Sequence, residues 1–465
     1  MSLEDQMGER LDVGDRLLTY KDVLDLDTRE VPKHIREERR GEFDFTEASI
    51  ERYISRDWHL REKELVWKRT WHFACREENL PDVGDHVVYS IADMSYLIVR
   101  SAPDEIRAYP NSCLHRGRQL KDHDGWCAEI RCAFHGLAWN LDGSFKQNPA
   151  PWEFPHVDES TFSLPTVSVG TWGGFVFINP DPDAAPLEDY LGELPEHFAK
   201  WGHEDRYIEA HVSKILRCNW KVAQEAYMEC WHAAATHPQT VPYAAFGVCQ
   251  VDCYDNFSRF ITPSEVVGPM MKGDPTTEEM LRATMDVRID EKLPVTPAEG
   301  QTAREFVVAS TREKWRGFLG EAIEEWADCE LVDNFTYTIF PNMMPWGGVH
   351  KLCYRFRPNG DDHRTCIMDV FLISPFTGER PAPSPEVRLD ADTPFSTRSE
   401  LGIVGNILDQ DVFNMEKVQY GLETTVKPTV TFATYQEDNI RWMHQLMDRY
   451  MAAGDKVNDE KAGEK

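Results

Sequence analysis

The order of hydrophobic and polar positions divides the chain into two main regions. Short alternating runs rich in β-branched and aromatic residues fill the stretch from 46 to 170, for example at 87–91, 96–100 and 106–109, and predict a small all-β domain. Beyond it, helical periodicity appears at 219–237, 303–328, 400–420 and 436–452, and strand-like runs at 331–340, 350–357 and 365–373. This mixture predicts an α+β fold in which helices pack on an antiparallel sheet.

Composition and punctuation complete the division into regions. The first 45 residues are charged and contain few apolar positions, which predicts a solvated arm. We therefore expect an arm at 1–45, the all-β domain at 46–170, the α+β domain at 171–454 and a disordered tail at 455–465. The segment 374–394, rich in proline, glycine and charge, predicts a loop.

Charge and cysteine content exclude several classes of protein. The 465 residues include 80 acidic and 50 basic side chains, a formal charge of -30, so nucleic acid and anionic lipid are unsuitable partners. No run of 18 apolar residues is present, so we expect no membrane span. The N-terminus lacks a signal-peptide pattern and the 11 cysteines are scattered. We expect a cytoplasmic protein, in which clustered Cys and His bind metal.

Two Cys/His pairs form the first candidate metal site. Cys113-Leu114-His115 is followed by Cys132-Ala133-Phe134-His135. Structural zinc sites usually take Cys-x2–4-Cys pairs from one knuckle, whereas one Cys and one His from each of two loops suit a Rieske [2Fe–2S] cluster. Zinc and two unrelated loop pairs are the alternatives.

Two further histidines lie near the end of a predicted helix. His232 and His237 are five residues apart, which places them about 140° apart on a regular helix, too far for one metal ion. The helix must therefore distort before Pro238. Two His alone are weak support, but with a distant carboxylate they would form a 2-His-1-carboxylate site for Fe(II).

The chain resembles a known family at both sets of residues. The segments 111–117 and 132–139 resemble the Rieske box of the aromatic-ring-hydroxylating oxygenases, in their alpha (catalytic) subunits. The segments 219–237 and 409–422 resemble the two helices that bind mononuclear iron in that family. The resemblance implies a Rieske domain joined to a helix-grip (START-like) catalytic domain. It implies a [2Fe–2S] cluster on Cys113, His115, Cys132 and His135, and Fe(II) on His232, His237 and Asp411, with Asp409 as the second choice.

The resemblance also implies how electrons reach the iron. Glu229 lies one helical turn before His232, where relatives carry an acidic residue that bridges the two metal centres across a subunit boundary. Its alternative is a solvated carboxylate. A homotrimer is therefore expected, with or without a small beta subunit, and a reductase or ferredoxin would supply electrons from NAD(P)H. Glu225 stands where many relatives have Asn, and its role stays open.

The expected function is hydroxylation of an apolar aromatic or alicyclic compound with O2, as a monooxygenase (including demethylation) or a dioxygenase. The alternatives are a Rieske electron carrier and a helix-grip small-molecule-binding protein. Large apolar residues between 240 and 350 are candidates for the substrate pocket, with ordinary core packing as the alternative; we single out Phe246, Met343, Met344 and Trp346.

Overall fold

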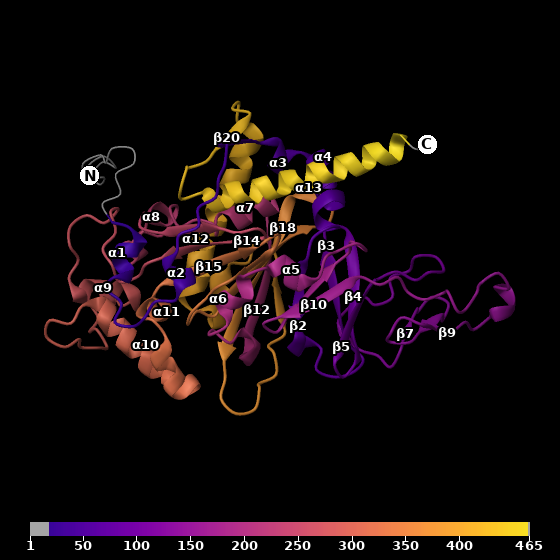
Figure 1. Cartoon of the computed structure of the whole chain (residues 1–465), viewed down its shortest axis with the longest axis horizontal. Coiled ribbons are helices and arrows are strands. Elements are labelled where there is room, and N and C mark those ends of the chain that lie inside the picture. The colour runs from indigo at the N-terminus through magenta and orange to yellow at the C-terminus, as the bar shows by residue number, and fades with distance from the viewer. Residues whose placement is uncertain (1–17, 464–465) are drawn as a thin grey trace.

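An eight-stranded sheet forms the centre of the computed structural model, which describes residues 18–463 (Figure 1). Its strand order is β13-β14-β15-β16-β17-β18-β12-β19, and among these strands only β12 and β19 pair in parallel. The strands predicted at 331–340, 350–357 and 365–373 are present as β15, β17 and β18. The bounds are β12 (Arg206–Leu216), β13 (Gln250–Cys253), β14 (Phe257–Thr262), β15 (Asn334–Ile339), β16 (Met343–Pro345), β17 (Leu352–Asn359), β18 (Asp362–Pro375) and β19 (Glu386–Leu389).

Strand β19 corrects one expectation, because it lies inside the segment 374–394 that we expected to be loop throughout. Its four residues pair with β12 from His211 to Lys214. Three long helices, α10, α12 and α13, and several shorter ones accompany the sheet. They are α5 (Leu187–Leu191), α6 (Leu194–Phe198), α7 (Trp220–Glu225), α8 (Ala233–Thr236), α9 (Thr277–Thr284), α10 (Ala303–Leu319), α11 (Asp328–Val332), α12 (Ile403–Thr424) and α13 (Asp438–Gly463).

Helix α13 packs against β13 and β14 at the sheet edge, and α7 packs against β17 and β18. One stripe of α13 is buried, at Ile440, Met443 and Met447, the spacing of a helix that covers a core. The helix continues to Gly463, so the expectation of a disordered tail from 455 is wrong up to that residue. Residues 464–465 lie outside the described part.

The N-terminal all-β domain forms three small sheets beside the large one. In Figure 1 its β7–β9 lobe projects at the right of the molecule. The boundary expected at 170 falls inside β10, which pairs with β11 in one hairpin. The strands are β2 (His72–Arg76), β3 (Asp85–Ile91), β4 (Met94–Ala102), β5 (Glu105–Pro110), β6 (Gly125–Trp126), β7 (Ile130–Arg131), β8 (Ala138–Trp139), β9 (Phe145–Gln147), β10 (Ser168–Trp172) and β11 (Phe175–Asn179).

The described part of the N-terminal arm is packed rather than free in solvent. Tyr20 is buried and donates a hydrogen bond to Asp333 Oδ2 at 2.8 Å, and Thr28 bonds Asp328. Residues 1–17 of the arm lie outside the described residues. The segment after the arm also contacts the C-terminal domain, because strand β1 pairs with β20 and helix α3 contacts α12. The elements of this N-terminal part are α1 (Tyr20–Leu24), α2 (Lys33–Arg36), β1 (Glu47–Ser49), α3 (Glu51–Ile54) and α4 (Arg56–Glu62), and the partner strand of β1 is β20 (Thr429–Thr431).

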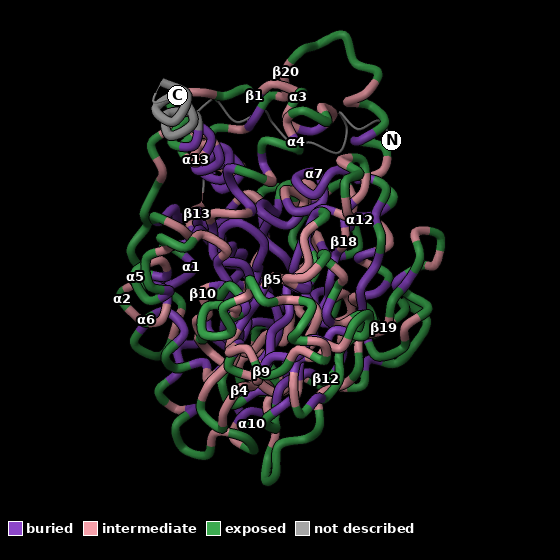
Figure 2. Tube along the Cα trace, turned by 90° about the vertical axis from the view of Figure 1, so that its right-hand side faces the viewer, coloured by how far each residue is buried: buried purple, intermediate pink, exposed green. Residues whose placement is uncertain are grey.

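Burial follows this layout, with buried backbone inside and exposed loops around it (Figure 2). A disulfide joins Cys230 to Cys249, and the other nine cysteines of the chain are buried and free. Among the described helices, none has the length and apolar content needed to cross a membrane.

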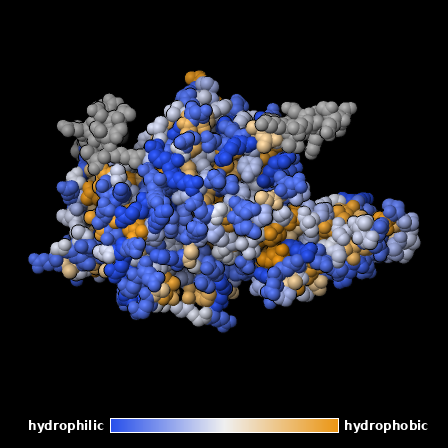
Figure 3. Space-filling view, in the orientation of Figure 1, coloured by the Kyte–Doolittle hydropathy of each residue, from blue (hydrophilic) through white to orange (hydrophobic). Residues whose placement is uncertain are grey.

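Hydrophobic surface interrupts the hydrophilic surface on the projecting lobe (Figure 3). The exposed large apolar residues of the all-β domain include Trp126, Phe134 and Trp152.

Candidate functional site

Two loops of the all-β domain bring together the four residues expected at the first site. One loop follows β5 and the other follows β7. Each carries one buried cysteine, Cys113 at 3% and Cys132 at 1% exposure. The rings of His115 and His135 lie 4.6 Å apart between centroids, and His135 is exposed. The thiols therefore face the interior of the domain, whereas the imidazole pair lies towards its surface.

The backbone of the two loops repeats one turn. The amides of Gly117 and Gly136 donate to the carbonyls of Cys113 and Cys132, at 2.9 and 3.0 Å. Both glycines have positive φ, 75° and 82°, a conformation that disfavours a side chain. Each turn thus folds tightly around its cysteine, which is the geometry that a buried cluster requires.

The side chains fit a [2Fe–2S] cluster. Burial, and then the neighbouring Cys132 thiol, raise the pKa of Cys113, so a bound cation is needed to hold the Cys113 sulfur as a thiolate. His115 Nδ1 is buried without a hydrogen-bond partner in the described residues, which is costly unless another ligand satisfies it. Two adjacent thiols and two adjacent imidazoles match the Cys2His2 donor set of a Rieske centre.

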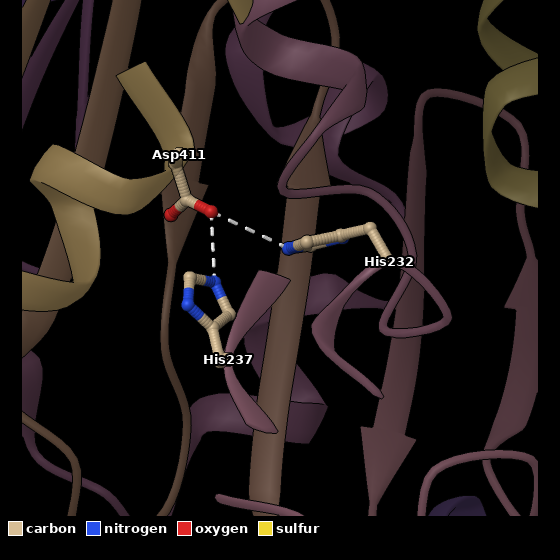
Figure 4. Close-up of side chains that lie close together, drawn as sticks. All are labelled: His232, His237 and Asp411. Atoms are coloured by element: carbon tan, nitrogen blue, oxygen red, sulfur yellow. Dashed lines mark ion pairs between the residues drawn. The ribbon is translucent and has the colours of Figure 1, made fainter. Parts of the chain in front are cut away.

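The second site brings His232, His237 and Asp411 together (Figure 4). His237 Nε2 lies 2.8 Å from Asp411 Oδ1, and His232 Nε2 lies 3.5 Å from the same oxygen. The ligand atoms of all three residues lie within 4.8 Å of one another. Asp411 comes from α12, whereas the two His flank α8, so the site joins segments far apart in sequence.

Outer hydrogen bonds fix how the two rings face the site. His232 Nδ1 contacts Glu229 Oε1 at 2.6 Å, and His237 Nδ1 contacts Gln410 Oε1 at 2.8 Å. Because both partners are acceptors, each Nδ1 carries the hydrogen and each Nε2 presents a lone pair to Asp411. Two lone pairs and a carboxylate oxygen then converge, and only a cation can hold them together.

Protonation of the site supports this conclusion. Asp411 Oδ1 is buried, and within the described residues it accepts no hydrogen while the two imidazoles turn their Nε2 lone pairs towards it; a proton on either ring would supply one. Burial lowers the pKa of His232, but hydrogen bonds to Asp411 and Glu229 outweigh it and raise this pKa to about 10. Burial likewise opposes ionisation of Asp411, yet the bonds to His232 and His237 lower its pKa. The cluster thus holds either a proton or a metal ion, and its donor set suits Fe(II).

Asp409, the second choice for the carboxylate ligand, has another role. Its two carboxylate oxygens accept the backbone N–H groups of Phe395 and Ser396, at 2.7 and 3.0 Å. It does not join the cluster of His232, His237 and Asp411.

The helix expected at 219–237 is broken. Helix α7 ends at Glu225 and α8 begins at Ala233, so the expected distortion is larger than one turn. Glu229 lies in the gap, and its Oε2 accepts the backbone N–H of His232 at 3.0 Å. Its carboxylate therefore positions both the backbone and the ring of His232, and it is 8% exposed.

A cavity of about 270 Å³ opens beside the cluster. Glu225, Glu229 and Glu437 line it together with His232 and Asp411. The rest of the wall is mainly apolar: Val222, Ala226, Met415, Val418, Leu422, Val430, Phe432 and Ile440.

The four residues proposed for the pocket do not line this cavity. Met343 and Met344 are fully buried in the two large core clusters, and Trp346 packs at the edge of one of them. Phe246 packs with Cys230 and Ala233, which lie on either side of His232 in the sequence. Met343 and Met344 therefore have the surroundings of the alternative interpretation, which is ordinary core packing.

Three residues that support the sites were not recognised as such in the sequence analysis. Gln410 orients His237 and directly precedes Asp411, so its position in the motif could have indicated it. Tyr53 and His444 contact Glu225 but lie far from it in sequence, and no local pattern identifies them.

Comparisons with known proteins identify both domains. Residues 70–163 match the Rieske [2Fe-2S] domain, and residues 197–453, more than half of the chain, match the ring hydroxylating alpha subunit (catalytic domain). The carnitine monooxygenase oxygenase subunit of Escherichia coli (strain K12) is 31% identical over 189 residues, 40% of this chain. The chlorobenzene dioxygenase subunit alpha of Cupriavidus sp. (strain PS12) is 31% identical over 193 residues, also 40% of the chain. These matches span 50% and 42% of the respective relatives.

Solved structures show the same fold over nearly the whole chain. A quaternary ammonium Rieske monooxygenase superposes with a TM-score of 0.62 at 18% identity, over 89% of this chain and 100% of the other. Naphthalene 1,2-dioxygenase with bound indole superposes with a TM-score of 0.61 at 15% identity, over 87% and 92%. Together with the match to the catalytic domain, these findings show that the chain belongs to the alpha subunits of the Rieske ring-hydroxylating oxygenases.

Proposed function

We propose that this chain is the catalytic subunit of a Rieske non-heme iron oxygenase. The observation that carries the proposal is the convergence of two imidazole lone pairs and the unpartnered Asp411 oxygen on one point beside a cavity. Fe(II) bound there by His232, His237 and Asp411 would keep one face open to O2 and substrate. The reaction would be hydroxylation, and the same three ligands serve monooxygenation and dioxygenation.

The [2Fe–2S] cluster would be held by Cys113, His115, Cys132 and His135, and would deliver electrons one at a time. A reductase or ferredoxin would supply them from NAD(P)H. In Figure 1 the β7–β9 lobe and α8 lie on opposite sides of the molecule, an arrangement that does not favour a short route within one chain. Transfer between neighbouring copies is the alternative, with Glu229 as the bridge to the iron ligand His232.

Surface chemistry supports an assembly of copies. The exposed His135 is accompanied by exposed Phe134, and the exposed Trp231 directly precedes His232. Apolar side chains exposed near both centres suit a protein interface. We therefore propose a homotrimer, with or without a small beta subunit, in which the lobe of one copy reaches the iron site of the next.

The substrate that the cavity wall favours is small and largely apolar, because hydrophobic side chains make up most of the wall. A small organic cation with an apolar body is the second candidate. Glu229 and Glu437 on the same wall favour it, and relatives named for carnitine and glycine betaine belong to the same family.

Product analysis with a His232→Ala variant tests the proposal. The wild-type protein, reduced by a Rieske reductase, should hydroxylate one compound in a panel of aromatic, alicyclic and quaternary ammonium candidates. The variant should keep the Rieske absorbance and form no product. Hydroxylation that survives in the variant would disprove the iron assignment, while the absence of both iron and Rieske absorbance in the wild-type protein would favour a helix-grip binding protein.

A further inference from the structure

The proposed reaction consumes protons as well as electrons. Insertion of one oxygen atom follows RH + O2 + 2 e− + 2 H+ → ROH + H2O, and cis-dihydroxylation also consumes two electrons and two protons. The reductase supplies the electrons. When a metal ion is bound by His232, His237 and Asp411, none of these three residues is free to give up a proton. A protonated side chain on the cavity wall would be a source of these protons.

Glu225 has the position that such an acid requires. Glu225 lines the cavity that His232 and Asp411 also line. It is seven residues before His232 and belongs to α7, so it is separate from the metal-binding cluster. Its oxygens contact Tyr53 Oη at 3.0 and 3.1 Å, a residue that also lines the cavity, and His444 Nε2 at 2.9 Å.

The network around Glu225 fixes the direction of these hydrogen bonds. Arg52 Nη1 lies 3.4 Å from His444 Nδ1, and an arginine can only donate, so Nδ1 is the acceptor. His444 Nε2 therefore carries the hydrogen and donates to Glu225 Oε1. Arg52 is itself paired with Asp448 at 2.8 Å, which holds it in this position.

Charged and titratable groups near Glu225 come from α3, α4, α7 and α13. Arg52 and the Tyr53 hydroxyl come from α3, Glu62 from α4, Lys221 from α7 itself, and His444 from α13. Glu437, which lies just before α13, lines the same cavity. Lys221 is fully engaged, because its ammonium pairs with Glu62 at 2.5 Å and both side chains are completely buried.

Burial dominates the ionisation of this carboxyl. It raises the pKa of Glu225 to about 8, although the Tyr53 hydrogen bond and the charges of Lys221 and Arg52 oppose the rise. Glu225 is thus a neutral acid at pH 7, with Tyr53 and His444 holding it at the cavity wall. Glu437, whose pKa burial raises to about 7, is half-buried and lies on the same wall, where it can exchange protons with solvent.

We propose that Glu225 is the acid that supplies protons to the cavity beside the His232–His237–Asp411 cluster, and that Tyr53 and His444 are its positioning residues. In each delivery the O–H bond of the carboxyl breaks, its proton enters the cavity, and the carboxylate is reprotonated from solvent. This inference rests on the proposed oxygenase function. It gives a role to Glu225, which stands at the position where many relatives have Asn.

Glu225→Gln is the central test, because glutamine keeps the shape and the acceptor oxygen but has no acidic proton. With pre-reduced enzyme and O2, product formation in a single turnover should fall about 100-fold, the lower range for general acid catalysis. The wild-type rate should decline as the pH rises through about 8, where Glu225 loses its proton, and this alkaline limb should be absent in the variant.

Infrared spectroscopy of the iron-free protein gives a readout that does not depend on activity. The wild-type protein should show a protonated carboxyl band that titrates near pH 8, and Glu225→Gln should lack it. Glu265→Gln is the matched control, since Glu265 is a second buried acid, its pKa raised to about 7 by burial, that lies outside the cavity. This control should lose a different band and keep wild-type turnover.

Tyr53→Phe covers the case in which Glu225→Gln fails to fold or to bind iron. Removing the hydroxyl takes away a donor to the carboxylate, so the pKa of Glu225 should rise and the alkaline limb should move up by roughly one to two pH units. An unchanged pH profile in this variant, or wild-type turnover in Glu225→Gln, overturns the inference. Failure of the oxygenase proposal is distinguishable, because the wild-type protein would then lack iron and product altogether.

Discussion

Replacing Glu229 by glutamine separates the two roles assigned to this side chain. Its Oε1 accepts the Nδ1 hydrogen of His232 at 2.6 Å, and its Oε2 accepts the backbone N–H of the same residue at 3.0 Å. Glutamine retains one acceptor oxygen, so the ring of His232 keeps a hydrogen-bond acceptor. The negative charge of that acceptor is lost. A charge-assisted hydrogen bond contributes about 1.5–3 kcal/mol, which at 1.36 kcal/mol per tenfold is about 10- to 150-fold.

The Glu229→Gln variant should lose turnover rather than bound iron. Iron affinity should weaken by about tenfold, as for other partners of metal-binding histidines, and saturating Fe(II) should restore a full complement. Turnover should still fall by at least about 100-fold if, as proposed, the Glu229 carboxylate mediates electron transfer from a neighbouring copy to His232. The assay mixes reduced protein with O2 and substrate and follows reoxidation of the cluster by its visible absorbance.

Glu416→Gln is the matched control for this experiment. Glu416 lies on α12, the helix of Asp411, and its carboxylate pairs with Arg217 at the surface. Its variant should reoxidise the cluster within about twofold of the wild-type rate. Wild-type reoxidation in Glu229→Gln would refute the bridging role, and loss of iron despite saturating Fe(II) would make Glu229 a ligand in place of Asp411.

Three further predictions follow from the same contacts. Asp411→Asn should remove the mononuclear iron while Asp409→Asn retains it, because Asp409 only accepts backbone N–H groups; metal analysis of both variants decides. Lys221→Met should lower the free energy of unfolding by about 3–5 kcal/mol, since it leaves the buried Glu62 carboxylate unpaired; denaturant titration measures it, and a loss below about 1 kcal/mol would contradict the reasoning. Cys132→Ser should abolish the Rieske absorbance yet keep the mononuclear iron, which iron and sulfide analysis checks.

Short-range spacing explains which parts of the sites were predictable from sequence. In each cluster loop the cysteine, histidine and glycine lie within five residues, so the tight turns at Gly117 and Gly136 were visible as a motif. Glu229 and His232 are three residues apart, and they do meet, although the helix that suggested their contact is broken there. The carboxylate at Asp411 could be chosen over Asp409 only through the resemblance to a family.

Contacts that depend on tertiary packing were not predictable. Met343 and Met344 are adjacent on β16 and face opposite sides of the sheet, into two different core clusters. No local pattern shows which side borders the cavity. The partners of Glu225 come from α3 and α13, more than 150 residues away in either direction, so its environment became clear only from the structure. The arm is similar, because the buried contact of Tyr20 is with the distant Asp333.

The most direct test of the account is a count of iron and acid-labile sulfide in the purified protein, with EPR of the dithionite-reduced sample. One [2Fe–2S] cluster and one mononuclear iron predict about three irons and two sulfides per chain, and a rhombic Rieske signal. Zinc without sulfide would contradict both metal assignments and, with them, the proposed oxygenase function.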